Sequence, residues 1–173
     1  VIVRFGVGVD NIDLEAATEK GIVVTYVPVY CQEEVATLAL TLMLVCERKL
    51  FQADKVVKGG SWASSVKTVD GARSTRGKTV GLVGLGAIPK KLIALLKPFG
   101  VNIISYDPYI NLEYCKENGI ESVELDELLK RSDYVSLHVP LMESTRHMIS
   151  ERELDMMKED AILINTARGA LVD

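Results

Sequence analysis

The chain has 173 residues, of which 20 are basic and 24 acidic, giving a net charge of −4; 48% are hydrophobic and 25% charged. This composition is typical of a globular protein with a sizeable core. It contains no dense basic tract, which argues against nucleic acid as a direct partner because phosphate binding requires concentrated positive charge. The longest apolar run, residues 38–46, is too short to cross a bilayer, so no membrane partner is expected.

The cysteines Cys31, Cys46 and Cys115 are odd in number and widely spaced. Because no CxxC pair or Cys/His cluster accompanies them, neither a metal site nor a disulfide framework is predicted. A reducing, cytoplasmic setting fits this pattern best. No signal peptide is recognisable, and we expect both ends of the chain to be cuts, since it begins within a predicted strand and without Met.

The first 27 residues predict one strand–helix–strand unit. Residues 1–5 and 22–25 are β-rich, and residues 14–20 form a helix that Asp13 caps and Gly21 ends. The short links favour parallel pairing of the two strands. We expect residues 1–27 to be the end of one domain and residues 28–173 to form another.

A long helix is predicted over residues 32–58, ending at Gly59. Its apolar residues lie on nearly every face, which is typical of a helix buried on several sides. We therefore expect a second subunit to cover part of the helix after Gln32, in a homodimer. The Ser/Thr/Gly-rich stretch that follows, with Trp62 just before it, predicts an ordered loop or arm.

The remainder of the chain alternates strands with helices. Short apolar runs separated by helices predict an α/β fold with a doubly wound parallel sheet, covered on both faces. The predicted strands are residues 79–83, 101–106, 134–137 and 161–164, and the predicted helices are residues 89–99, 112–118, 125–130 and 151–157.

A glycine-rich loop, GLGAIP, joins the strand at residues 79–83 to the next helix. Gly84 would permit the tight turn and Gly86 would let the backbone approach a pyrophosphate, with the helix N-terminus supplying N–H groups. The alternative is a plain strand-to-helix turn. Pro89 stands where a third glycine is usual, so we predict that the helix begins at Pro89, that Ile88 lies outside the α region, and that the site loses some fit or one donor.

A carboxylate, Asp107, follows the next strand, 23 residues after Gly84. This is where an acid can accept hydrogen bonds from the adenosine ribose, and its charge would repel a ribose phosphate, favouring NAD over NADP. The alternative is that Asp107 with Pro108 only initiates a turn.

Four segments carry a resemblance to a known family. They are GVGVDNID at residues 6–13, YDPY at 106–109, LHVPL at 137–141 and NTARGALVD at 165–173. In this order they resemble the motifs of the D-isomer-specific 2-hydroxyacid dehydrogenases. The surroundings of Tyr30 and Cys31 are most similar to the branch of C-terminal binding proteins, with phosphoglycerate and glyoxylate dehydrogenases as close alternatives.

The resemblance implies a Rossmann-type NAD-binding domain in residues 28–173, truncated at its C-terminal end, and a remnant of a flavodoxin-like substrate domain in residues 1–27. It implies that Arg168 binds the substrate carboxylate and polarises the keto oxygen, which suits a guanidinium fork. The cofactor NAD would contact Val7, Cys31, Gly84, Gly86, Ala87, Ile88, Asp107, Val139, Pro140, Thr166, Ala167 and Arg168.

The resemblance also implies an oxidoreductase that acts on the CH–OH group of small D-2-hydroxy acids, or in reverse on 2-keto acids. The family's proton-exchanging histidine and its glutamate lie downstream of the last matching segment, so this chain alone is expected not to turn over substrate. One alternative is a non-catalytic, NAD-sensing and dimerising regulator of the C-terminal binding protein type. Another is a relative that binds no cofactor.

Two residues also have interpretations that are independent of the family. Arg168 follows a predicted apolar strand, which places it at the carboxyl end of a parallel sheet, where such sheets bind ligands. The alternative is an exposed surface arginine. His138 lies at another strand end and is predicted to be a hydrogen-bonded structural histidine rather than a base.

Overall fold

The structure, a computed structural model, describes residues 1–60 and 67–173, so the predicted arm residue Trp62 lies outside the described residues. Two compact units are present, Val1–Gln32 and Glu33–Asp173. Within the described ranges, no helix is both long and apolar enough to cross a membrane.

The first unit is the predicted strand–helix–strand. It consists of β1 (Ile2–Val3), α1 (Leu14–Glu19) and β2 (Val24–Thr25), and β1 pairs with β2 in parallel. The Asp13 carboxylate caps α1 by accepting a hydrogen bond from the Ala16 N–H at 2.9 Å. Both strands are shorter than predicted; β1 ends before the bend that begins at Phe5, and β2 begins only at Val24.

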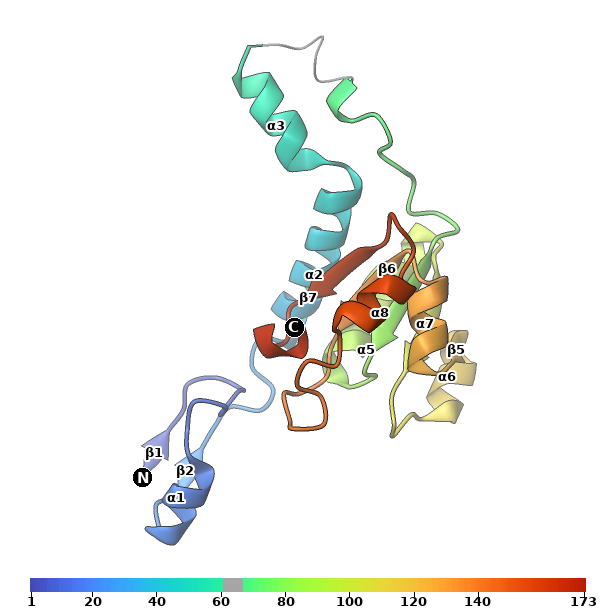
Figure 1. Cartoon of the computed structure of the whole chain (residues 1–173). Coiled ribbons are helices and arrows are strands. Elements are labelled where there is room, and N and C mark those ends of the chain that lie inside the picture. The colour runs from blue at the N-terminus through green and yellow to red at the C-terminus, as the bar shows by residue number, and fades with distance from the viewer. Residues whose placement is uncertain (61–66) are drawn as a thin grey trace. The chain divides into compact units, whose positions relative to one another are not determined.

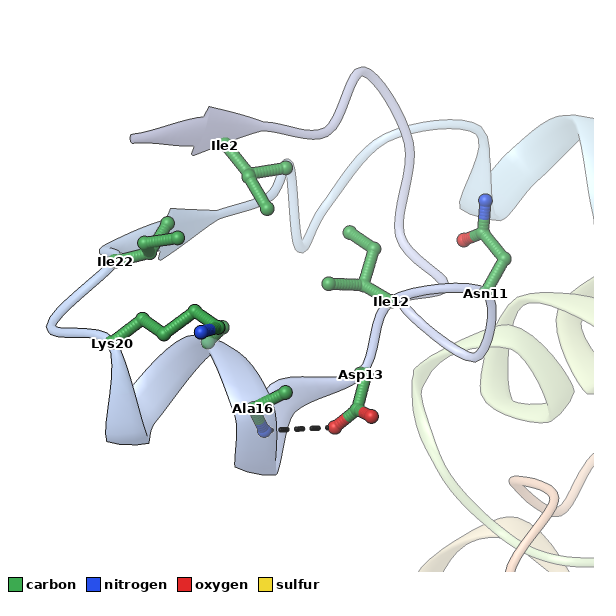
Figure 2. A pocket seen from close by; sticks show the side chains of 8 residues that line it. Ile2, Asn11, Ile12, Asp13, Ala16, Lys20 and Ile22 are labelled. Atoms are coloured by element: carbon green, nitrogen blue, oxygen red, sulfur yellow. Dashed lines mark hydrogen bonds between the residues drawn. The ribbon is translucent and has the colours of Figure 1, made fainter.

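A surface depression of about 330 Å³ lies between α1 and the strands of this unit (Figure 2). Its lining residues are Ile2, Asn11, Ile12, Asp13, Ala16, Ala17, Lys20 and Ile22. None of the predicted cofactor residues is among them, so the depression does not coincide with the glycine-rich loop.

The second unit is built on a five-stranded, wholly parallel sheet with the order β5-β4-β3-β6-β7. The strands are β3 (Thr79–Val83), β4 (Asn102–Tyr106), β5 (Ile120–Ser122), β6 (Tyr134–Leu137) and β7 (Ile162–Asn165). The first strand of the sheet in sequence is β3; β4 and β5 then add to one side of it, and β6 and β7 add to the other. The strand order therefore reverses between β3 and β6, which is where open α/β sheets bind ligands.

Helices cover both faces of this sheet, as a doubly wound fold requires (Figure 1). The helices are α2 (Gln32–Glu47), α3 (Leu50–Lys58), α5 (Ala87–Leu96), α6 (Leu112–Asn118), α7 (Leu125–Arg131) and α8 (Glu151–Met156). Buried residues of α2, α5 and α6 pack with Val80 and Leu82 of β3, whereas α7 packs with Val83 in a second core. Alternate residues of one strand therefore enter opposite cores. The predicted fold class is confirmed, although β5 was not predicted.

The predicted single helix over residues 32–58 is wrong, because it is broken between α2 and α3. Lys49 has φ +50° and ψ +40°, in the left-handed region that ends a run of α-helix. Its side chain donates a hydrogen bond to the backbone oxygen of Asp70, so a contact distant in sequence holds the break. Gly59 caps the end of α3, where the sequence predicted the helix to stop.

The predicted start of the next helix is also wrong. Helix α5 begins at Ala87, with Gly86 as its N-cap, so Ile88 is helical and Pro89 is the third helical residue. The first hydrogen bond of the helix runs from the Lys90 N–H to the Gly86 oxygen at 3.3 Å. Pro89 is tolerated because the N–H groups of a first helical turn have no partner within the helix. The helix ends at Leu96, before a 3₁₀ turn at Lys97–Phe99.

Candidate functional site

The glycine-rich loop begins where β3 meets its two neighbouring strands. Gly84 has φ +96°, and a Cβ there would lie 3.0 Å from the backbone oxygen of His138. Its N–H donates to the Tyr106 oxygen at 2.8 Å. Gly84 is therefore held between the ends of β4 and β6 at the position where the strand order reverses, and only glycine fits there without strain.

The second glycine faces open space. Gly86 is exposed, and apart from its own and adjoining residues no described atom lies within 4 Å of the place a Cβ would take. It precedes the N–H groups of Ala87 and Ile88 at the start of α5, which have no acceptor within the helix. This arrangement leaves room and two donors for a phosphate at the positive end of the helix. Because Pro89 lacks an N–H, the first turn of α5 offers no third donor at this position.

Asp107 contacts the glycine-rich loop directly. Its Oδ2 accepts a hydrogen bond from the Leu85 N–H at 2.7 Å, and its Oδ1 accepts one from the Tyr109 N–H at 2.8 Å. The second of these bonds is the turn interaction that the sequence offered as an alternative to ligand binding. The two roles are compatible, since each carboxylate oxygen can accept more than one hydrogen bond.

The end of β6 forms the other side of this region. His138 Nε2 lies 2.9 Å from the Ser136 hydroxyl, and burial lowers the pKa of His138 to about 4. The imidazole is therefore neutral at neutral pH and hydrogen-bonded, as predicted for a structural histidine. Val139 comes next, with its Cγ1 atom 3.1 Å from the place of a Gly84 Cβ, and Pro140 is exposed.

Arg168, the predicted substrate-binding arginine, lies in the turn that follows β7, and hydrogen bonds with Asn165 hold this turn. Asn165 Nδ2 donates to the Arg168 oxygen at 2.8 Å, and Asn165 Oδ1 accepts from the Ala167 N–H at 3.1 Å. Arg168 is partly buried, and its Nη1 donates to the Ala167 oxygen at 2.8 Å. The Thr166 hydroxyl is buried without a hydrogen-bond partner among the described residues, so its capacity is available to a ligand.

Most of the sequence-predicted residues therefore gather at one edge of the sheet, at or just after the carboxyl ends of β3, β4, β6 and β7. They are Gly84, Gly86, Ala87, Ile88, Asp107, Val139, Pro140, Thr166, Ala167 and Arg168. Val7 and Cys31 belong instead to the N-terminal unit. The sequence reasoning missed the Leu85 N–H and the Ser136 hydroxyl; the only available signal for the latter was its position two residues before His138 on the same strand.

The family model for the NAD-binding domain of D-isomer specific 2-hydroxyacid dehydrogenases matches residues 40–173. The chain belongs to this family. Similar curated proteins are named as a D-3-phosphoglycerate dehydrogenase of Methanocaldococcus jannaschii, 47% identical, and a glyoxylate reductase of Thermococcus litoralis, 44% identical. Each comparison covers 100% of this chain, but only 33% and 54% of those proteins, respectively.

Solved structures of this dehydrogenase family have the same fold. Apo D-lactate dehydrogenase from Escherichia coli superposes with a TM-score of 0.87 at 34% identity, over 99% of this chain and 53% of that one. The NAD-binding domain of D-isomer specific 2-hydroxyacid dehydrogenases binds NAD. The residues present here fit that cofactor, since Gly86 leaves open space before two N–H groups that have no acceptor within the helix, and Asp107 lies beside the same loop. The recognition from the sequence motifs is confirmed.

Proposed function

We propose that this chain is the NAD-binding part of an oxidoreductase acting on the CH–OH group of small D-2-hydroxy acids, or in reverse on 2-keto acids. The observation that carries the proposal is the Gly86 loop, open at the N-terminus of α5 and braced from the side by Asp107. The names of the relatives, which include glyoxylate and hydroxypyruvate reductases, support a small acid as substrate. When bound, NAD would accept or supply the hydride.

The proposed contacts follow the order of the strands. The Ala87 and Ile88 N–H groups would hold the pyrophosphate and Asp107 the adenosine ribose, with Val139 and Pro140 beside the adenine side. Thr166 and Ala167 would lie near the nicotinamide. The Arg168 guanidinium would bind the substrate carboxylate as a two-pronged donor and polarise the oxygen on the neighbouring carbon.

We further propose that the N-terminal unit contributes to the same site. Val7 would reach the nicotinamide or the substrate carboxylate, and Cys31 a cofactor phosphate. Residues 1–27 would then be the last part of a flavodoxin-like substrate domain. All three cysteines are free, which supports a reducing, cytoplasmic location for the protein.

The first prediction concerns the ribose carboxylate. Asp107→Ala is expected to weaken NAD binding about 10- to 100-fold, because charge-assisted hydrogen bonds to the ribose are lost. Titration calorimetry with NAD measures this change. Asp107→Asn is the matched control: it keeps an acceptor for the Leu85 N–H but removes the charge, and its affinity is expected to fall between the other two. Equal NAD affinity in all three proteins would remove Asp107 from the site.

A homodimer through α2 and α3 is also proposed. The side chains of Leu38 on α2 and of Leu50 and Phe51 on α3 are 50%, 53% and 73% exposed, respectively, although they are large and apolar. Large exposed apolar residues on adjoining helices are typical of interaction surfaces. The sequence predicted that the long helix is buried on several sides. In a single copy of the chain these residues of α2 and α3 remain exposed, so we propose that a second copy covers them.

A charged residue placed on α3 tests the proposed dimer. Phe51→Glu is expected to weaken self-association about 30-fold in sedimentation equilibrium, because a charge would be buried in an apolar interface. Leu112→Glu, at an exposed apolar site on α6, is the control and should leave the association constant unchanged. A large increase in the association constant when NAD is added would favour the second candidate, an NAD-sensing regulator, over an enzyme that dimerises equally well without NAD.

A further inference from the structure

The excursion of the chain between α2 and β3 is closed at its base. The last residue of α2 and the two residues after it each contact a residue of the returning segment, and we call these three contacts the neck. The three pairs are Glu47 with Thr75, Arg48 with Arg73, and Lys49 with Asp70. These contacts therefore join the segment that leaves α2 to the segment that returns to β3.

Glu47 is the buried member of the neck, with only 3% of the residue exposed. Its Oε2 accepts a hydrogen bond from the Thr75 hydroxyl at 2.8 Å, whereas its Oε1 and the Tyr134 hydroxyl are buried and have no hydrogen-bond partner within residues 1–60 and 67–173. Burial, and then the Glu47 carboxyl, raise the pKa of Tyr134 above its ordinary value. The carboxyl thus lies between the base of the excursion and the first residue of β6. A buried carboxyl tolerates few arrangements, because each lost hydrogen bond is costly.

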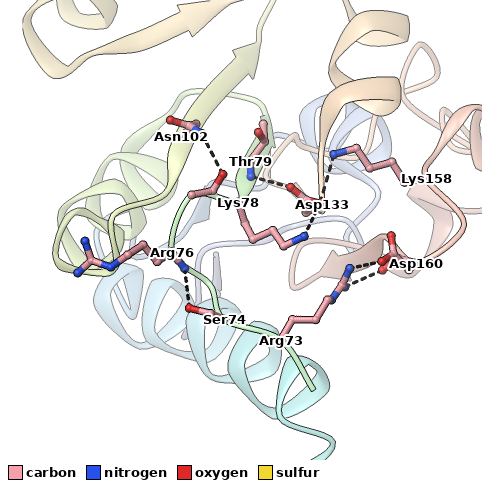
Figure 3. A network of polar contacts seen from close by, with 10 residues as sticks. Arg73, Ser74, Arg76, Lys78, Thr79, Asn102, Asp133, Lys158 and Asp160 are labelled. Carbon is pink, nitrogen blue, oxygen red and sulfur yellow. Dashed lines mark hydrogen bonds and ion pairs between the residues drawn. The ribbon is translucent and has the colours of Figure 1, made fainter. Parts of the chain in front are cut away.

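The returning segment is also tied to the sheet by ion pairs (Figure 3). Arg73 pairs with the Asp160 carboxylate and donates to the Asp160 backbone oxygen at 2.9 Å. Lys78 lies 3.3 Å from Asp133, which also accepts from the Thr79 N–H at 2.8 Å. Burial alone would raise the pKa of Asp133, but the Thr79 N–H, Lys158 and Lys78 outweigh it and hold that pKa below its ordinary value. The segment is therefore fixed to the amino-terminal edge of the sheet.

Helix α3 lacks an anchor of its own within the described residues. It has no buried residue, and Leu50, Phe51 and Val57 are exposed. Among the described residues, the contacts that can set its direction are those of the neck at its base, where Lys49 adopts the left-handed conformation. That conformation is unfavourable for lysine, and the hydrogen bond from its side chain to Asp70 offsets part of the cost.

We propose that the neck is a positioning device, centred on the Glu47–Thr75 hydrogen bond, that holds α3 in one direction so that its apolar face meets a second copy of this chain. The partner is the same surface of the second copy, and this part of the inference rests on the dimer proposed above. Glu47 and Thr75 act through α3, because the second copy would contact α3 and not the neck. The direction of α3 can be measured in a single copy, independently of association.

The experiment compares Thr75→Val, which removes the hydroxyl at nearly constant shape, with Thr75→Ser, which keeps it. Spin labels at Lys55 on α3 and Lys116 on α6, both exposed, report the direction of α3 relative to the sheet. Exposed Cys46 and partly buried Cys31 are replaced by serine in every sample, and labelled protein is diluted with unlabelled protein. Wild type and Thr75→Ser are expected to give one narrow distance distribution, and Thr75→Val to lose that single peak.

Sedimentation provides the second measurement. Thr75→Val is expected to weaken dimerisation about tenfold and Thr75→Ser not at all, because each copy would spend less time in the competent orientation. Identical distance distributions in the three proteins would overturn the neck as a positioning device. A monomeric wild type with a narrow distribution would instead overturn the dimer and support the neck. Should Thr75→Val fail to unfold cooperatively, Arg48→Met, which removes the exposed side-chain donor to the Arg73 oxygen in the neck, repeats the comparison, with Arg131→Met, at an exposed ion pair on α7, as control.

Discussion

Replacing Gly81 with alanine is expected to lower the free energy of unfolding by about 3 kcal/mol. Gly81 lies in the middle of β3, and a Cβ there would collide with the Ser132 hydroxyl and would lie 2.6 Å from Leu128 Cδ2. Neither neighbour can move away easily, since Leu128 is fully buried and the Ser132 hydroxyl donates to the Leu128 oxygen at 2.6 Å. Overpacking and the loss of that hydrogen bond both contribute to the expected destabilisation.

Urea unfolding followed by circular dichroism measures the Gly81→Ala effect, and Gly86→Ala is its matched control. Because a Cβ at Gly86 meets open space, that variant should lose only the N-cap preference for glycine over alanine, about 0.5–1 kcal/mol, well below the loss expected for Gly81→Ala. Its NAD affinity should nevertheless fall, since the new methyl group would occupy the space left for the phosphate. A Gly81→Ala protein as stable as wild type would contradict the close approach of α7 to β3.

The second large effect is a loss of stability on mild acidification, caused by His138. Burial lowers the pKa of this residue to about 4, whereas an unfolded histidine titrates near 6.5. Between these two values the unfolded chain binds a proton that the folded protein does not. Stability is therefore fully present above about pH 6.5 and falls as the pH drops towards 4, by about 3 kcal/mol in all.

The measurement is the difference in unfolding free energy between wild type and His138→Gln at several pH values from 7 to 4. The difference isolates His138, because the other titrating groups are common to both proteins. Glu153 adds to acid sensitivity in a lower range, since the Ser150 hydroxyl and then Arg152 lower its pKa to about 2, and its contribution is lost only as the pH falls below about 4.5. A pH-independent difference above pH 4.5 would show that His138 is not buried as a neutral ring.

The sequence predicted the fold well wherever local signals and tertiary packing agree. The Asp13 cap of α1 and the four main strands of the sheet were visible from short apolar runs between helices. The break at Lys49 was not, because no glycine or proline marks it and the helical pattern runs through it; the contact with Asp70 decides the conformation there. Strand β5 was missed because only Ile120 in it is buried.

The site was predictable in its residue types but not in its internal contacts. Gly84, Gly86 and Asp107 could be identified from their spacing, since each has a known role at the end of a strand. Pro89 misled the prediction of the helix start, because a proline is tolerated anywhere in the first turn and Gly86 already caps α5. The bond between Asp107 and the Leu85 N–H joins the segments that follow β3 and β4, 22 residues apart, so no local pattern could reveal it.

That bond has a consequence for redesigning the cofactor preference. The usual way to admit a ribose phosphate is to exchange the carboxylate for a small neutral or basic side chain. In this protein such an exchange at Asp107 also removes the acceptor of the Leu85 N–H, in the middle of the phosphate loop. A cofactor switch should therefore keep an acceptor of the same reach at residue 107, as asparagine does, and introduce the positive charge at exposed Tyr109 instead.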